Sequence, residues 1–414
     1  MSTRKPIGYG RQDISSADIR AVVDCLEGDF LTQGPRVAAF EAALCEATGA
    51  RHAVAVSSGT AALHLAYLAM GLGPGDVGVT SPISFVATSN GLLYAGASVA
   101  FADVDPRTGI VRPEEIEGVV ERLVAEGRTP KVITPVDLAG QPADRQAVRA
   151  IADRHGAHVL EDAAHSLGAT YEADGRTHRV GGCAHADAAI LSFHPVKHVT
   201  TGEGGAVLTN DTALYRRLSD LRTHGIHKDP ARLSRSSDDD PFVGPWYYEQ
   251  AELGFNYRIT DLQCALGASQ MTRLPAFIAR RQAIAAEYDR ALGQGILAEH
   301  LRPALRLPNR THAHHLYVVQ LRPRLGEDLR ARAARRKALF LRLAAERVHC
   351  QVHYIPIPWQ PYYRENPQVL RQNLSGAEEY YASSLSIPIY PAMTDADVTR
   401  VIEALERACR GTQP

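Results

Sequence analysis

"HAVAVSSGTAALHLAYLAMG", residues 52–71, holds the pattern that decides the fold. The apolar run at 52–56 predicts a β-strand, a turn of small residues follows it, and residues 60–71 predict a helix. A strand joined to a helix in this way is the first half of a βαβ unit. The stretch therefore predicts an α/β protein with a mostly parallel sheet.

The same alternation continues along the chain. Further strands are predicted at 77–82, 98–104, 131–138 and 157–162, with helices at 85–96, 113–127 and 144–156 between them. Two more strands, at 187–193 and 204–210, leave little room for a helix between them. We expect a tight hairpin there, which breaks the βαβ alternation.

The length of the chain predicts two domains. Its 414 residues exceed the roughly 250–300 at which one hydrophobic core stops growing. We place the large domain at 1–250 and a smaller α/β domain at 251–414. Long helices over 260–293 lead into the second domain, which carries predicted strands at 315–321 and 348–357 and a helix at 335–348.

The composition excludes several classes of function. Lys+Arg 45 against Asp+Glu 46 gives a formal net charge of -1, so no overall field favours nucleic acid or an anionic membrane. The six cysteines form no CxxC pair, which is typical of reduced thiols. The first residues lack the apolar core of a signal peptide, and no run of about 18 apolar residues occurs. We expect a cytoplasmic protein that binds neither nucleic acid nor membrane.

Three local features suggest chemistry, and each has an ordinary alternative. Ser58 and Thr60 lie where a strand meets a helix, a turn whose free N–H groups bind phosphate, although both residue types are also common helix caps. Asp162 ends a strand, where α/β sheets keep their ligand crevices, or it caps the next loop. Lys197 lies in the Gly-rich hairpin, where it is either a solvated charge or a sheltered amine that forms a Schiff base.

The three features fit one cofactor better than they fit the separate alternatives. A carboxylate at a strand end is costly to bury without a cationic partner, and the pyridine nitrogen of pyridoxal phosphate is such a partner. A phosphate turn, an Asp at a strand end and a Lys in a defined loop are together far more specific than any one of them.

The order of motifs along nearly the whole chain resembles the DegT-type nucleotide-sugar aminotransferases of the fold-type I pyridoxal phosphate enzymes. The motifs are "SSGTAALHLA", "SPISFVATSNGLLYAGA", "VDLAGQP", "EDAAHSLGA", "SFHPVKHVTTGEGGA", "GFNYRITDLQCALG" and "QVHYIPI". The resemblance implies a fold-type I large domain that binds the cofactor, a smaller C-terminal domain, and a homodimer with shared active sites.

The resemblance also implies a role for each matching residue. Lys197 would hold the cofactor covalently and Asp162 would face its ring nitrogen. His165 stands where many members have a Gln near the ring hydroxyl, and an imidazole can donate that hydrogen bond too. Phe85 would stack on the ring, although without the family it is equally well a core residue of a helix. The remaining matches are the phosphate-binding positions Gly59, Thr60 and Ser192, Asn256 from the neighbouring subunit, and the substrate positions Thr32, His353 and Tyr354.

The branch of the family that the chain resembles most aminates the C4 ketone of a UDP-linked 4-keto-6-deoxy-N-acetyl-altrosamine-type sugar with L-glutamate, in pseudaminic acid synthesis. The alternatives are an aminotransferase for another UDP- or dTDP-linked keto-deoxysugar, a dehydratase or regulator that has lost transamination, and a non-enzymatic scaffold. The family's dehydratases replace the lysine with a histidine, whereas Lys197 is present here.

Two further points bear on the site. His312, His314 and His315 suggest a metal cluster, but no Cys or carboxylate lies at ligand spacing, so we expect no metal. The polar segment 227–245 is either a plain surface loop or a lid whose cations close over a nucleotide.

Overall fold

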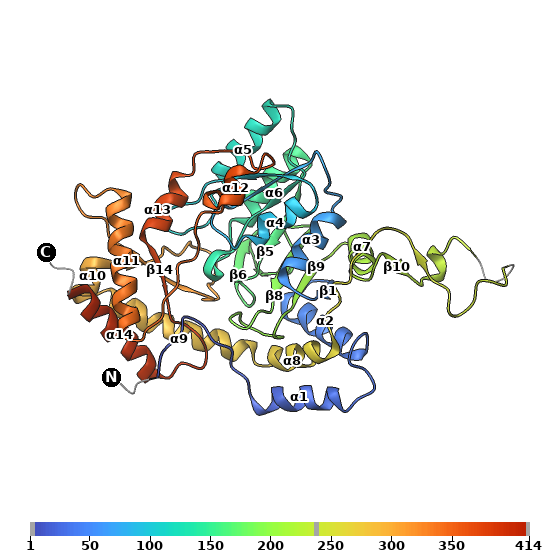
Figure 1. Cartoon of the computed structure of the whole chain (residues 1–414), viewed down its shortest axis with the longest axis horizontal. Coiled ribbons are helices and arrows are strands. Elements are labelled where there is room, and N and C mark those ends of the chain that lie inside the picture. Colours follow the sequence, from blue (N-terminus) through green and yellow to red (C-terminus); the bar gives the residue numbers. More distant parts are fainter. Residues whose placement is uncertain (1–4, 236–239, 411–414) are drawn as a thin grey trace.

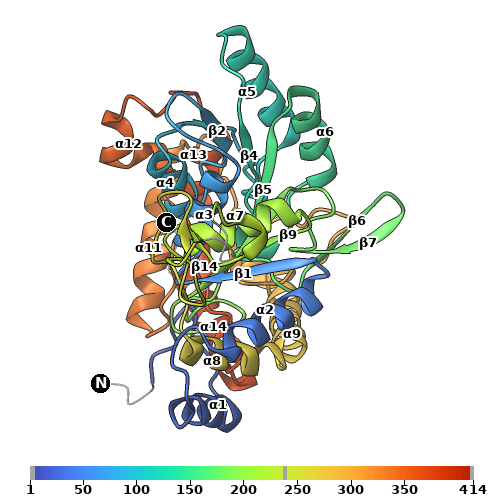
Figure 2. The same cartoon turned by 90° about the vertical axis from the view of Figure 1, so that its right-hand side faces the viewer.

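The computed structural model describes residues 5–235 and 240–410. Its centre is a seven-stranded sheet in the order β1-β9-β8-β5-β4-β2-β3 (Figures 1 and 2). The strands are β1 (His52–Val56), β2 (Val77–Thr80), β3 (Ser98–Phe101), β4 (Val132–Thr134), β5 (His158–Asp162), β8 (Ala188–Ser192) and β9 (Gly205–Thr209). Within this sheet β9 alone runs antiparallel to its neighbours, β8 and β1. The predicted α/β class with a mostly parallel sheet is confirmed, and so is the hairpin between the last two strands.

Helices cover both faces of the sheet. The helices of the first 300 residues are α1 (Ser16–Leu26), α2 (Pro35–Thr48), α3 (Gly59–Ala69), α4 (Ala87–Tyr94), α5 (Pro113–Ala125), α6 (Arg145–His155), α7 (Thr212–Arg222), α8 (Asp261–Met271), α9 (Leu274–Leu292) and α10 (Gly295–His300). Along β1, Val54 and Val56 join the core that contains α3, whereas Ala53 and Ala55 join the core that contains α2 and α8. Successive strand residues point to opposite faces, so α3 and α2 lie on opposite sides of the sheet.

A second core lies in the C-terminal part of the chain. Here α9, α11 (Leu329–Ala345) and α14 (Asp395–Arg410) pack with the antiparallel sheet β12 (Leu301–Pro303), β13 (Tyr317–Leu321) and β14 (Ser384–Ile387). In Figure 1, α11 and α14 are the orange and dark red helices at the left, and the golden α9 runs towards them from below the sheet. This core begins at Ile284 and also takes in Ile7, whereas Cys264 and Leu274 pack with Phe40 of α2. The division of the chain into two domains at 250 stays a prediction.

The prediction of a strand over 348–357 is wrong. The segment forms single β-bridges at Val348 and Gln351 and otherwise runs without regular structure. Pro356 and Pro358 lack the N–H groups that a strand ladder needs. The segment instead passes along the pocket described below, and the short helices α12 (Pro361–Glu365) and α13 (Ser375–Ser383) follow it.

Two hairpins lie outside these cores. One is β6 (Thr170–Ala173) with β7 (Arg176–Arg179), and the other is β10 (Ile226–His227) with β11 (Glu249–Gln250). The described residues between β10 and β11, 228–235 and 240–248, form an arm that extends past α7 at the right of Figure 1. Asp238 and Asp239 of the predicted loop lie outside the described residues. No helix within 5–235 and 240–410 has both the length and the apolar character that a bilayer crossing needs.

Candidate active site

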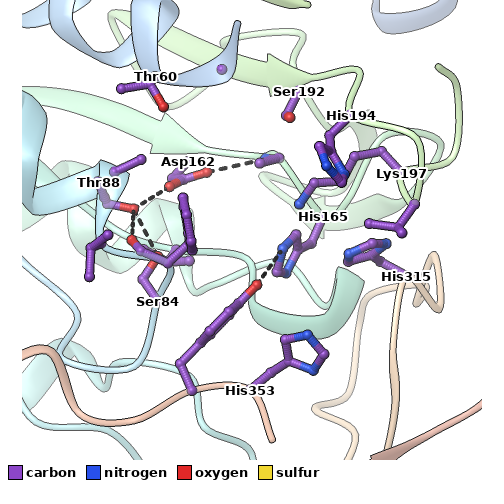
Figure 3. Close-up of a pocket in the computed structure, with 18 of the residues that line it drawn as sticks. Thr60, Ser84, Thr88, Asp162, His165, Ser192, His194, Lys197, His315 and His353 are labelled. Atoms are coloured by element: carbon purple, nitrogen blue, oxygen red, sulfur yellow. Dashed lines mark hydrogen bonds between the residues drawn. The ribbon is translucent and has the colours of Figure 1, made fainter. Parts of the chain in front are cut away.

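A pocket of about 670 Å³ opens at the carboxyl ends of the parallel strands (Figure 3). Asp162 ends β5 and Ser192 ends β8, while the turn after β1 brings Gly59 and Thr60 to the same edge. Parallel strands end on one side of a sheet, and this side is where α/β proteins bind ligands. The pocket therefore gathers residues as distant in the sequence as Tyr9 and Gln360.

The N-terminus of α3 forms one end of the pocket. The hydroxyl of Ser58 caps the helix by accepting from the N–H of Ala61 at 3.1 Å. Within the described residues, no acceptor pairs with the N–H groups of Gly59 and Thr60. A Cβ at position 59 would come within 3.0 Å of Ser192 Cβ, so glycine allows the helix to approach the end of β8. Two free N–H groups beside two hydroxyls suit an anion such as phosphate.

Asp162 is held by a short polar network. Thr88 on α4 donates to its Oδ2 at 2.6 Å, and the N–H of Ala164 donates to Oδ1 at 3.2 Å. The Ser84 hydroxyl lies 2.8 Å from that of Thr88 and so fixes its orientation (Figure 3). Burial raises the pKa of the Asp162 carboxyl, while the hydrogen bond from Thr88 opposes this effect. The carboxylate would gain from a cationic partner in the pocket.

Thr88→Val should raise the pKa of Asp162 further, because valine keeps the shape but removes the hydrogen bond that stabilises the carboxylate. An NMR titration of carbon-labelled aspartate in the ligand-free protein measures this pKa. Ser89→Ala is the matched control, because the Ser89 hydroxyl contacts Val86 and Tyr363 and not Asp162. An unchanged Asp162 titration in Thr88→Val would show that the contact has no electrostatic effect.

Lys197 lies in the turn of the β8–β9 hairpin. The loop is closed by bonds from the N–H of Phe193 to Gly204 O (2.9 Å) and from the N–H of Thr201 to Phe193 O (3.0 Å). Burial lowers the pKa of Lys197 to about 8, and the attraction of Asp162 opposes this shift. A substantial fraction of the amine is therefore unprotonated near neutral pH, as a nucleophile requires.

His165 presents a defined tautomer to the pocket. The N–H of Ala139 donates to its Nδ1 at 3.3 Å, so its proton sits on Nε2, which faces the Tyr354 hydroxyl at 3.4 Å. Asp137, two residues before Ala139, is ion-paired with the buried Arg145. It also accepts the N–H of Ala143 and so holds the backbone around Ala139 in place. His165 is thus a neutral hydrogen-bond donor.

Five buried histidines lie in the pocket that holds Lys197 or in the segments next to it. In each, burial is the largest cause of a lowered pKa, to about 3 in two of them, and nearby cations add to the effect. They are His165, His198, His314, His315 and His353. The folded protein keeps these imidazoles neutral at a pH where an unfolded chain would protonate them.

Acid should therefore destabilise the fold steeply. Below the unfolded-state pKa of 6.5 the unfolded chain binds protons that the folded state does not, so the free energy of unfolding is lost as the pH falls from about 6.5 toward 3. Each histidine contributes at most about 1.4 kcal/mol per pH unit. Urea unfolding at stepped pH values measures the slope. His314→Asn should make it shallower by about one proton, and an identical slope would show that His314 is protonated in the fold.

The structure brings most of the predicted site residues into this pocket. Phe85 is 59% exposed and lines it together with His353 and Tyr354, so the alternative of a core phenylalanine is wrong. His353 Nδ1 lies 2.9 Å from the Ser386 hydroxyl, which fixes its ring. Two predicted residues, Thr32 and Asn256, are exposed and lie outside the pocket.

Thr32 and Asn256 belong to adjoining segments. Thr32 forms a β-bridge with Thr260, four residues after Asn256. The fully buried Asp261 accepts the N–H groups of Gly34 (2.7 Å) and Arg36 (2.9 Å), which ties the two segments together. The two residues therefore lie in neighbouring segments of the chain, and neither lines the pocket.

Two of the cations in the predicted lid segment 227–245 lie within the arm and are ion-paired. Arg232 is ion-paired with Asp220 and Arg235 with Asp240, an arrangement that favours charge balance over nucleotide binding for these two. In the described part of the chain no three potential ligands converge on a metal position, and the His312 Nδ1 instead accepts the N–H of His314.

The sequence did not point to several pocket residues. Ser84, Thr88, Tyr9, Glu203 and His315 all line it. Thr88 lies one helical turn after Phe85 on α4, so helical spacing could have placed it beside the site. Tyr9 comes from the N-terminal segment, for which no local pattern gave a signal.

Several known proteins are similar to this chain in sequence and in fold. A sequence model of the DegT/DnrJ/EryC1/StrS aminotransferase family matches residues 12–406. The spore coat polysaccharide biosynthesis protein SpsC of Bacillus subtilis is 37% identical over 405 residues, which cover 97% of each chain. Helicobacter pylori PseC, an aminotransferase involved in the biosynthesis of pseudoaminic acid, superposes with a TM-score of 0.86 at 29% identity, over 98% of this chain and 100% of that one. The sugar aminotransferase CalS13 of Micromonospora echinospora superposes with a TM-score of 0.80 at 26% identity, over 97% and 99%.

Proposed function

Because the chain belongs to the DegT/DnrJ/EryC1/StrS aminotransferase family, we propose that it moves the amino group of L-glutamate to the C4 ketone of a UDP-linked 4-keto-6-deoxy-N-acetyl-altrosamine-type sugar. Sugar amination with pyridoxal phosphate is the activity of the family. The narrower choice of substrate is supported by the likeness to PseC over the whole chain. The observation that carries it is the pocket that holds together Lys197, whose pKa is lowered to about 8 by burial, and the buried Asp162.

The residues of the pocket fit pyridoxal phosphate. The free N–H groups at the start of α3, with Thr60 and Ser192, would hold its phosphate. Asp162 would pair with its ring nitrogen, Phe85 offers a flat exposed face for the ring, and the Nε2–H of His165 suits its phenolic oxygen. Each polar group that the cofactor presents thus finds a partner of the opposite kind.

When bound, pyridoxal phosphate supplies a ring that accepts electron density from the carbon that gains or loses a proton. Asp162 keeps that ring protonated through its negative charge. Lys197 binds the cofactor, and its freed amine takes a proton from the amino-acid carbon and returns one as general base and acid. A pKa of about 8 suits both directions of this transfer at neutral pH.

We further propose that the active protein is a homodimer in which Asn256 completes the partner's phosphate site. Thr32 and Asn256 lie in neighbouring segments of the chain, and neither lines its own pocket. Beside Thr32 the chain exposes an apolar surface on α1 and the residues after it: Ile19, Val23, Leu26, Phe30 and Leu31. A patch of this kind is typical of a protein interface.

Mixed dimers test the shared site. Lys197→Ala and Asn256→Asp should each be inactive alone, the second because its carboxylate repels the cofactor phosphate. If the site is shared, a mixed dimer contains one intact site, with Lys197 from one chain and Asn256 from the other. Coexpression should therefore restore activity, up to half that of the wild type per mixed dimer. Failure to restore activity would show that both residues serve the same chain.

Another UDP- or dTDP-linked keto-deoxysugar is the second candidate, because the chain also resembles SpsC and CalS13 over nearly its whole length. A dehydratase is disfavoured by Lys197. Turnover of a panel of UDP- and dTDP-linked 3-keto and 4-keto sugars with L-glutamate decides between them. We expect the UDP-linked altrosamine-type 4-ketone to be the fastest, and its failure with success of another sugar would contradict only the narrow proposal.

A further inference from the structure

His315 is a pocket residue to which the proposed reaction assigns no role. It lies just before β13, lines the pocket and is 4% exposed. In Figure 3 its ring lies on the side of the pocket that carries Lys197, next to His165. Its Nδ1 is buried and has no hydrogen-bond partner within the described part of the chain. A polar atom left bare in this way is costly, so it needs a structural or functional reason.

Hydrogen bonds from Arg281 hold the backbone of His315 in place. The guanidinium Nη1 of the fully buried Arg281 on α9 donates to His314 O (3.0 Å), His315 O (3.2 Å) and Ile389 O (2.9 Å). A Cβ at Gly140 would lie 3.1 Å from the backbone nitrogen of His315. The segment of Gly140 and the segment of His315 are therefore packed too closely for a side chain at position 140.

The ring is fixed as well. It packs on His165, with ring centres 4.3 Å apart, and on His198 at 5.7 Å. The Nε2 of His198, the residue after Lys197, lies 2.9 Å from Ala313 O, which joins the lysine loop to the segment that carries His315. Burial lowers the pKa of His315 well below its usual value, and His165, Lys197, His198 and Arg281 lower it further. The imidazole therefore stays neutral.

We propose that His315 is a positioning residue for Lys197, whose amine hydrogen-bonds the imidazole while it is free of the cofactor and is thereby aimed at the carbon that exchanges its proton. An amine carries both N–H donors and a lone pair, so it can pair with either tautomer of a neutral imidazole. The Nε2–H of His165 is already assigned to the cofactor's phenolic oxygen, and His353 Nδ1 is held by Ser386, whereas the buried Nδ1 of His315 has no hydrogen-bond partner in the described chain. The inference rests on the proposed aminotransferase reaction.

His315→Phe should slow the half-reaction with L-glutamate about tenfold, which is the scale of one lost hydrogen bond. Phenylalanine keeps the ring that packs on His165. KM for L-glutamate and the resting absorbance of the bound cofactor, including its pH titration, should not change, because Lys197 is then tied to the cofactor. His315→Gln, whose amide can exchange the same hydrogen bond, should restore most of the rate.

His314→Asn is the matched control, because His314 is the buried neighbour and does not line the pocket. Its half-reaction should run at the wild-type rate. An unchanged half-reaction rate in His315→Phe would overturn the positioning role. A shift in the pH titration of the bound cofactor's absorbance would overturn it too. A wild-type protein that binds pyridoxal phosphate but does not react with L-glutamate would contradict the proposed function, and this inference would fall with it.

Discussion

Lys197→Ala should abolish amino transfer. The loss should exceed about 10⁴-fold, because a positioned proton-transfer group alone supplies roughly 10²–10⁴-fold and Lys197 also holds the cofactor. Steady-state turnover of L-glutamate with the accepted keto sugar measures the effect. The fold should persist, since the side chain lines a pocket and takes part in no ion pair among the described residues.

Lys131→Ala is the control for the general loss of a lysine. Its amine is paired with Asp76 and lies outside the pocket. It should retain full activity. Turnover above a trace in Lys197→Ala, with its circular dichroism spectrum unchanged, would remove Lys197 from the reaction and with it the proposed mechanism.

Asp162→Asn should lower the rate of the half-reaction with L-glutamate by about 10²–10³-fold, the scale seen when one preorganised electrostatic group is removed. The amide keeps the shape and can still accept from Thr88 at 2.6 Å, but it lacks the charge that keeps the ring nitrogen protonated. Pyridoxal phosphate should still bind through its phosphate and through Lys197. Stopped-flow absorbance follows the half-reaction directly.

Asp187→Asn is the matched substitution outside the pocket. Its carboxylate pairs with Arg149 and accepts the N–H of Val159, so the change should reduce stability and leave the rate alone. A half-reaction in Asp162→Asn as fast as in the wild type would show that the ring nitrogen needs no charged partner here.

The sequence predicted the sheet because each strand is a short apolar run between amphipathic helices. It predicted Asp162 at the end of a strand and Lys197 in a hairpin loop, and the structure has Asp162 at the end of β5 and Lys197 between β8 and β9. Parallel strands end at one edge, so adjacency in space followed from the fold class. The family resemblance supplied the roles, which local pattern could not.

Other parts depend on contacts that no local pattern encodes. The apolar run at 348–357 suggested a strand, but Pro356 lacks a donor for a strand ladder, and His353 and Tyr354 line the pocket instead of pairing with a neighbouring strand. His315 is adjacent in sequence to His314, yet of the two only His315 lines the pocket, and the carbonyls of both accept from Arg281 on α9, which is distant in the sequence. The roles proposed for Thr32 and Asn256 depend on a second chain, so neither the sequence nor the packing of one chain tests them.

The central claim is that Lys197 holds the cofactor. The purified protein, loaded with pyridoxal phosphate, is reduced with borohydride to make the bond permanent, and digested peptides are sequenced by mass spectrometry. The pyridoxyl phosphate group is expected on Lys197, in the peptide that contains "SFHPVKHVTTGEGGA". Its presence on another lysine, such as Lys131 or Lys228, or its absence from every peptide, would contradict the account.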